Sequence, residues 1–268
     1  MSQWSRRKAS GLPVRNLSLP IFFNGISEED QITEIREALK NMRYCSLTKT
    51  RTINLSCLAI KNLPINSLLA AMKEEVMPLS QSVDYEMVFS ETKIVLNVEG
   101  NLLESLPLEL FSAKNLHAIL LRSNKLQTVP PEIGNLKSLC MLTLSGNPIR
   151  HLPIEITSLS ISMFSICEKH FMSQEEIDRE NSRVEFPAET LNELCLKTLP
   201  LGDVCRTPSR IKKALRVCYA CKSLTSIAGT VYKYMLYREQ MIPFYMSVCS
   251  SSCKEKCLSD AEEEAPAE

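Results

Sequence analysis

Four cysteines near the C-terminus have a spacing that can hold a metal ion. Cys218 and Cys221 are separated by two residues, and Cys249 and Cys253 are separated by three. Thiolates are strong ligands for Zn²⁺, and four of them close a tetrahedral structural site. We therefore expect a structural zinc ion in a zinc-ribbon-like module over residues 213–257. Cys257 is an alternative to Cys253 as the fourth ligand.

The segment between the two pairs is rich in aromatic and β-branched residues, which favours the two strands of a hairpin. A bound metal would supply folding energy to a segment too small to form its own core. The alternative interpretation is a set of reduced, partly buried thiols. With eleven cysteines and no signal-peptide pattern, the sequence favours a reducing compartment, so we expect a nuclear and cytoplasmic protein.

Other residues suited to catalysis are sparse. The three histidines are isolated in the sequence, and neither a P-loop nor a G-x-G-x-x-G motif is present. The chain has 31 basic and 31 acidic residues, and this zero net charge disfavours a globally basic nucleic-acid binder. No apolar run approaches the length of a membrane span. We expect a protein that has no enzymatic activity, does not associate with a membrane and makes no direct contact with nucleic acid.

An internal repeat precedes the cysteines. The pattern L-x-L-x-x-N-x-L-x-x-L-P recurs at intervals of 23 residues, with Asn101, Asn124 and Asn147 in the same position. A weaker copy begins at Ile53 and has Leu58 in the asparagine position, and we expect a further degenerate copy over 77–87. This pattern is typical of leucine-rich repeats, in which each copy adds one strand to a parallel sheet.

The predicted fold is therefore an α/β solenoid, a parallel-sheet horseshoe of leucine-rich repeats over 51–165. Its leucines form the core. Asn101, Asn124 and Asn147, called the slot asparagines below, are expected to bind backbone groups at the bends. Residues 1–50 are expected to cap the first repeat, with a helix over about 27–43. The charged segment 172–186 is expected to be a loop, and the acidic tail 258–268 to be disordered.

A protein partner is expected on the concave strand face, where side chains alternate with the buried ones. Leu120 and Met141 should lie next to each other there, exposed between charged residues. The candidate substrate-binding residues are Glu99, Leu120, Arg122, Met141 and Thr143.

Residues 186–212 are expected to form a short helical segment with an amphipathic face. A proline at 187 precedes the helix and another at 200 ends it. The apolar face can pack on the end of the solenoid, or it can enter the groove of a partner. It consists of Leu191, Leu194, Cys195 and Leu199, with Thr190 at its start.

These residues resemble the BC box, (S/T/P)-L-x-x-x-C-x-x-x-aliphatic, through which ubiquitin-ligase substrate receptors bind elongin C. The resemblance implies that Leu191 is the anchor and that Cys195 allows a close approach. A following cullin box, aliphatic-Pro-x-x-aliphatic, is partly matched by Pro208 and Ile211, but Thr207 occupies its first position.

Over residues 50 to 257 the layout resembles the leucine-rich repeat protein 1 family, in which repeats, a BC box and a cysteine-paired module follow each other. Members are substrate receptors of cullin-2 ubiquitin ligases, and in animals they remove the replicative helicase from chromatin. The resemblance implies elongin C, a cullin and a protein substrate as partners. Family members carry a longer N-terminal domain of pleckstrin-homology type, for which 50 residues are too few. The alternative function is an intracellular leucine-rich repeat scaffold in signalling, without a role in ubiquitin transfer.

Overall fold

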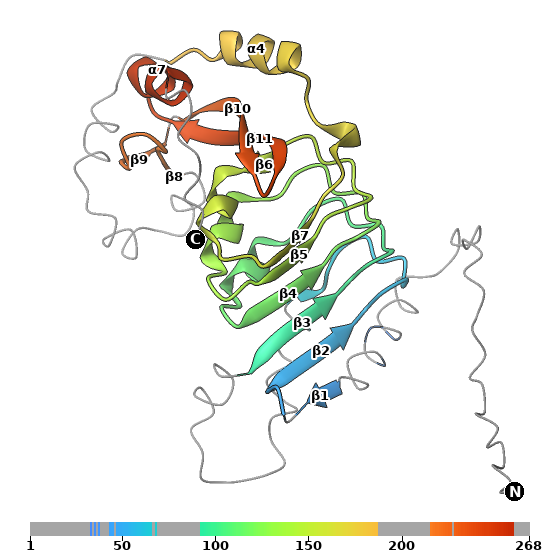
Figure 1. The fold of residues 1–268 in the computed structure, drawn as a ribbon. Helices are drawn as coiled ribbons and strands as arrows, with labels where there is room; N and C mark the ends of the chain where they lie inside the picture. Colours follow the sequence, from blue (N-terminus) through green and yellow to red (C-terminus); the bar gives the residue numbers. More distant parts are fainter. Residues whose placement is uncertain are drawn as a thin grey trace, which may run out of the picture.

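The computed structural model describes residues 33, 35, 37, 43–45, 47–65, 68, 92–186, 215–226 and 228–259. Their strands stack into a curved solenoid with a smaller unit at its C-terminal end (Figure 1). β1 (Arg43–Cys45) pairs antiparallel with the first strand of a five-stranded parallel series. The series is β2 (Thr50–Asn54), β3 (Lys93–Asn97), β4 (Leu116–Leu120), β5 (Met141–Thr143) and β7 (Met163–Ser165). The predicted parallel-sheet solenoid is confirmed.

The strands align so that the core residues of successive repeats lie over one another. Leu96 pairs with Ile119, and Ile119 pairs with Leu142, and all three are completely buried. Burial of each such side chain stabilises the fold by about 1.5–3 kcal/mol. Short 3-10 helices return the chain after β3, β4 and β5, and their leucines and isoleucines close the core from the other side. They are η1 (Leu108–Ser112), η2 (Pro131–Asn135) and η3 (Ile154–Ser158).

The slot asparagines form a ladder of hydrogen bonds inside the solenoid. The Asn124 side chain accepts a hydrogen bond from Leu103 N and donates to the carbonyl oxygens of Val98 and Leu121, at 3.0–3.1 Å. Asn147 repeats these three bonds one turn later. The asparagines therefore satisfy buried backbone groups at each bend, as predicted.

The first repeat differs from the expectation. β2 pairs directly with β3, so no strand of a degenerate repeat lies between them, and that prediction is wrong. Residues 77–87 themselves lie outside the described residues. The missing asparagine at Leu58 is compensated by the next repeat, because Asn101 Oδ1 accepts hydrogen bonds from Leu58 N and Ile60 N.

The predicted loop over 172–186 is mostly a helix, α4 (Gln174–Arg183). A capping box begins it, because Ser173 and Glu176 each bind the other's backbone N–H. The buried Ile177 anchors the helix on the protein. The high charge of this segment favoured a loop, but the capping box and one buried apolar side chain are enough to stabilise a helix here.

The C-terminal unit, residues 215–226 and 228–259, is called the cysteine module below. It contains a short hairpin, β8 (Arg216–Val217) and β9 (Leu224–Thr225), and a long one, β10 (Gly229–Tyr237) and β11 (Gln240–Val248). The long hairpin confirms the two strands expected between the cysteine pairs. α7 (Ser251–Ser259) follows and includes Leu258, so the start of the expected disordered tail is helical.

The cysteine module is joined to the solenoid by strand pairing. β6 (Leu152–Pro153), in the last repeat, pairs parallel with Phe244 and Tyr245 of β11. The Tyr245 hydroxyl donates to the carbonyl oxygen of Val129 at 3.1 Å. Phe164 of β7 and Tyr237 of β10 meet edge to face at 5.4 Å between ring centroids. The hairpin therefore covers the C-terminal end of the repeats, as Figure 1 shows.

At the other end, Thr33, Ile35 and Glu37 are helical, and Ile35 is buried in the core. The helix expected to reach residue 43 ends earlier, because Arg43 begins β1. Edge pairing by β1 takes part in covering the first repeat.

Candidate metal centre and interaction face

The first cysteine pair lies in the turn of the β8–β9 hairpin. Cys218 N donates to the Ser223 carbonyl oxygen, and Lys222 N donates to the Cys218 carbonyl oxygen, each at 2.9 Å. Lys222 has a positive φ of 60°, which lets the chain turn tightly behind the pair. This local bonding directs Cys218 and Cys221 to the same side of the turn.

The second pair lies where the long hairpin ends and α7 begins. Cys249 follows the last residue of β11, and Cys253 is in the first turn of the helix. The Ser250 hydroxyl accepts a hydrogen bond from Cys253 N at 3.3 Å. The start of α7 thus places Cys253 Sγ close to Cys249 Sγ.

The four sulfur atoms of Cys218, Cys221, Cys249 and Cys253 all lie within 4.8 Å of one another. Cys221 Sγ is 3.6 Å from Cys249 Sγ, and Cys249 Sγ is 3.7 Å from Cys253 Sγ. Zn–S bonds of about 2.3 Å in a tetrahedron place the sulfurs about 3.8 Å apart. The arrangement therefore fits a Cys₄ zinc site.

Cys257, the alternative ligand, does not belong to this group of four sulfurs. It lies one helical turn after Cys253 and is buried. Its carbonyl oxygen accepts a hydrogen bond from Lys233 Nζ at 3.3 Å. Its position is that of a packing residue between α7 and β10.

The electrostatics of the thiols differ within the cluster. Burial alone would raise the pKa of Cys221, but hydrogen bonds with Ser223, and then with Cys218 and Cys249, lower it to about 6. Burial raises the pKa of Cys218 and of Cys249. Metal binding requires deprotonated thiols, and Cys221 supplies one at neutral pH.

The group of four cysteines is compatible with the expected zinc module. The first pair lies in the turn of a hairpin, whereas the second pair lies where α7 begins. Three residues instead of two separate Cys249 from Cys253, and their Sγ atoms still lie 3.7 Å apart.

The concave face carries the predicted substrate-binding residues, but with less exposure than expected. Arg122 is exposed, whereas Glu99, Leu120, Met141 and Thr143 are partly buried. Leu120 pairs with Thr143, and Met141 pairs with Ala118, so Leu120 and Met141 are not direct neighbours across the strands. Neighbouring strands about 4.8 Å apart shield each side chain from water.

The sequence analysis missed Met163 on this face. It lies in β7, opposite Met141, and its side chain is 53% exposed. β7 lies beyond the last repeat that has a slot asparagine, so the repeat pattern does not place Met163 on this face. The side-by-side apolar pair on the concave face is therefore Met141 and Met163.

Two sets of expected binding residues lie outside the described residues. The elongin C-binding set is Thr190, Leu191, Leu194, Cys195 and Leu199, and the cullin-binding set is Pro208 and Ile211. The described residues on both sides of this segment lie at the cysteine module. A Cβ on Gly229 at the start of β10 would touch Phe186, and Leu215 is buried directly before β8.

Within the described residues, no helix has the length and apolar character needed to cross a membrane. Comparison with curated proteins finds no match. Among solved structures, the leucine-rich repeat protein LIC12759 of Leptospira interrogans is 27% identical over 49% of this chain, with a TM-score of 0.34. The alignment spans 33% of that protein's chain.

The family model for the leucine rich repeat matches residues 95–149. The matched residues run from β3 through β5 and include all three slot asparagines, which stack as described above. The chain therefore contains leucine-rich repeats over residues 95–149, and their curved parallel sheet has the shape that repeat proteins use as a binding surface.

Proposed function

We propose that this protein is a substrate-recognition adaptor of an elongin C/cullin-2 type ubiquitin ligase and has no catalytic activity of its own. What supports the proposal is the combination of a leucine-rich repeat solenoid with residues 190–199, whose sequence resembles a BC box and whose two flanks lie on one small module. The transfer of ubiquitin would belong to the partners. A nuclear and cytoplasmic location, and a substrate in the chromatin replication machinery, are parts of the same proposal.

The concave face is the proposed substrate site. Met141 and Met163 offer an apolar centre, and Arg122 and Glu99 offer charges of both signs beside it. Apolar residues surrounded by charged ones are typical of protein contacts. A protein substrate, and not a small molecule, suits a face of this extended shape.

The cysteine module supports the proposed elongin C site by position. Phe186, at one flank of the BC-box-like segment, lies against Gly229 of the cysteine module, and Leu215, at the other flank, is a buried residue of that module. A structural Zn²⁺ held by Cys218, Cys221, Cys249 and Cys253 would stabilise the base from which the segment leaves and to which it returns.

Binding of the elongin B–elongin C complex to the full chain, measured by isothermal titration calorimetry, tests the proposal. Leu191→Ala should weaken binding by about thirtyfold or more, since a hot-spot anchor contributes about 2 kcal/mol or more. Leu196→Ala is the matched control, because Leu196 lies in the same segment but outside the BC-box pattern. No binding by the parent, or equal weakening by both variants, would leave the signalling scaffold as the better function.

A further inference from the structure

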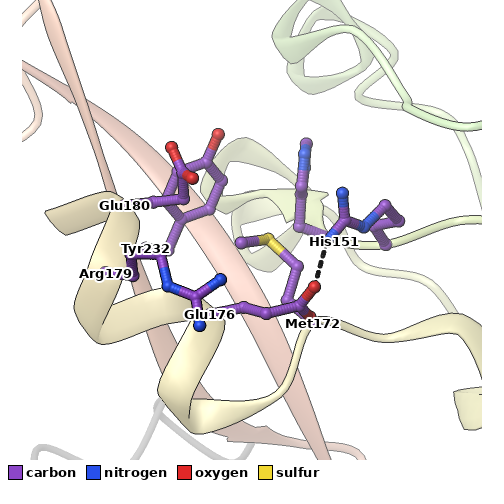
Figure 2. A pocket seen from close by; sticks show the side chains of 7 residues that line it. His151, Met172, Glu176, Arg179, Glu180 and Tyr232 are labelled. Carbon is purple, nitrogen blue, oxygen red and sulfur yellow. Dashed lines mark hydrogen bonds and ion pairs between the residues drawn. The ribbon is translucent and has the colours of Figure 1, made fainter. Parts of the chain in front are cut away.

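A polar cavity of about 360 Å³ lies where the last repeat, α4 and β10 meet (Figure 2). Its lining comes from three parts of the chain that are distant in sequence. Ligand pockets commonly range from about 300 to 1,000 Å³, so this one has room for a small molecule or a single side chain. It is lined by Arg150, His151, Met172, Glu176, Arg179, Glu180 and Tyr232.

Both carboxylates in the cavity are already bound within the protein. Glu176 accepts hydrogen bonds from Ser173 N at 2.9 Å and from Arg150 at 2.8 Å, and a dashed line in Figure 2 marks the second of these. Glu180 forms an ion pair with Arg183 at 2.9 Å. The acidic groups are therefore occupied by helix capping and ion pairing.

The basic groups keep unused donors. Arg150 binds Glu176 through one nitrogen, which leaves further N–H groups of its guanidinium. Arg179 forms no ion pair with any other part of the described chain. Tyr232 lines the same space, and its hydroxyl, which lies within the influence of the Glu180 charge, has no hydrogen bond to another described residue. Three side chains from three elements thus offer donors to one cavity.

The floor of the cavity is aromatic and uncharged. The His151 ring packs against the rings of Tyr232 and Tyr245, with both centroids 5.1 Å away. Its Nδ1 is buried and has no hydrogen-bond partner among the described residues. Burial, together with the positive charge of Arg150, lowers the pKa of His151 to about 4, so the ring is neutral at physiological pH.

We propose that this cavity binds an oxyanion, a carboxylate or phosphoryl group, between Arg150, Arg179 and the Tyr232 hydroxyl. Guanidinium groups bind both kinds of anion through paired hydrogen bonds. The apolar surface of Met172 and the Tyr232 ring would contact the carbon skeleton that carries the anion. The site is separate from the concave face and does not depend on the proposed ligase function.

Titration of the full chain with inorganic phosphate, O-phosphoserine and N-acetylglutamate, followed by NMR chemical shifts, tests this proposal. Saturable shifts at Arg179 and Tyr232 are expected with at least one of the three. A response to phosphate and phosphoserine alone identifies a phosphoryl site, and a response to N-acetylglutamate alone identifies a carboxylate site.

Arg179→Gln should lower the affinity by about tenfold to a hundredfold, as expected for the loss of hydrogen bonds to a charged group. Arg238→Gln is the matched control, since it removes the same charge from the turn of the long hairpin, away from the cavity. Tyr232→Phe retains the ring packing and should weaken binding by a smaller factor. Absence of saturable binding of all three probes, or equal affinity of Arg179→Gln and the parent, would overturn the proposal.

Discussion

The side-chain amide of Asn181 and the backbone of Tyr232 bind each other through two hydrogen bonds. Asn181 Nδ2 donates to the Tyr232 carbonyl oxygen at 2.7 Å, and Asn181 Oδ1 accepts from Tyr232 N at 2.8 Å. Tyr232 lies in β10, an edge strand of its sheet within the described residues. The amide therefore occupies the place of a neighbouring strand and fastens α4 to the cysteine module.

Asn181→Ala should lower the free energy of unfolding by about 1–3 kcal/mol, because it leaves the two backbone groups of Tyr232 without partners. Chemical denaturation measures this value. Asn135→Ala, at an exposed position at the end of η2, is the control and should change stability by less than about 0.5 kcal/mol. Equal stability of the two variants would contradict this role of Asn181.

The contact between Asn181 and Tyr232 also shows which kind of contact the sequence does not predict. The repeat could be predicted because each copy makes the same local demand for leucine and asparagine, as Asn101, Asn124 and Asn147 show. Asn181 binds a backbone 51 residues away, and no local pattern encodes such a partner.

The candidate sites also differ in whether the sequence alone predicts them. The four cysteines could be recognised because metal ligands of one type come in close pairs. The cavity at Arg150 and Arg179 could not, because its residues meet only after β6 pairs with β11. The helical position of Cys253 required knowledge of α7, whose first turn carries it.

Cys218→Ser should abolish metal binding and destabilise the cysteine module. Structural zinc sites contribute on the order of 10 kcal/mol to the folding of small modules, and three thiols bind more weakly than four. Zinc content by mass spectrometry and the melting temperature measure the effect. Cys167→Ser, at an exposed position outside the cluster, should retain one zinc per chain and the parent's melting temperature.

A second pair of variants tests which cysteine is the fourth ligand. Cys253→Ser should lose the metal, whereas Cys257→Ser should retain it and lose only a small amount of packing energy. Thiolate-to-metal absorption of the cobalt-substituted protein reports the number of sulfur ligands. An unchanged spectrum in Cys253→Ser would exclude the cluster described above.

His151 should make the protein less stable in mild acid. Its folded pKa of about 4 lies below the ordinary value of 6.5, because the ring is buried and lies beside Arg150. The unfolded chain therefore binds the proton more readily, so the stability that is present above pH 6.5 is lost as the pH falls toward 4. The expected loss between pH 7 and pH 5 is about 2 kcal/mol.

His151→Phe isolates this effect, since it keeps a ring between Tyr232 and Tyr245 but cannot be protonated. The difference in unfolding free energy between this variant and the parent should change by about 2 kcal/mol from pH 7 to pH 5. Metal content is measured at each pH, so that loss of metal from the cysteines is not mistaken for the effect of His151. A difference independent of pH would show that folding does not lower the pKa of His151.

Removal of the metal should loosen the last repeat but not the middle of the solenoid. The cysteines fix the ends of the β8–β9 hairpin and of β11, and β11 in turn pairs with Leu152 and Pro153. Repeats contact only their neighbours, so the loss of one end need not unfold the rest. Hydrogen exchange of the chelated protein should therefore lose protection in β10, β11 and around Leu152.

β4 is the internal control for that experiment, because it lies between β3 and β5 and makes no contact with the module through strand pairing. Its amides should keep the protection that they have in the metal-loaded protein. Uniform loss of protection would mean that the metal holds the whole chain together as one cooperative unit. Unchanged protection in β11 would mean that pairing with β6 alone is enough to hold the hairpin. Only selective loss fits a module that closes the end of the solenoid because its four cysteines bind a metal.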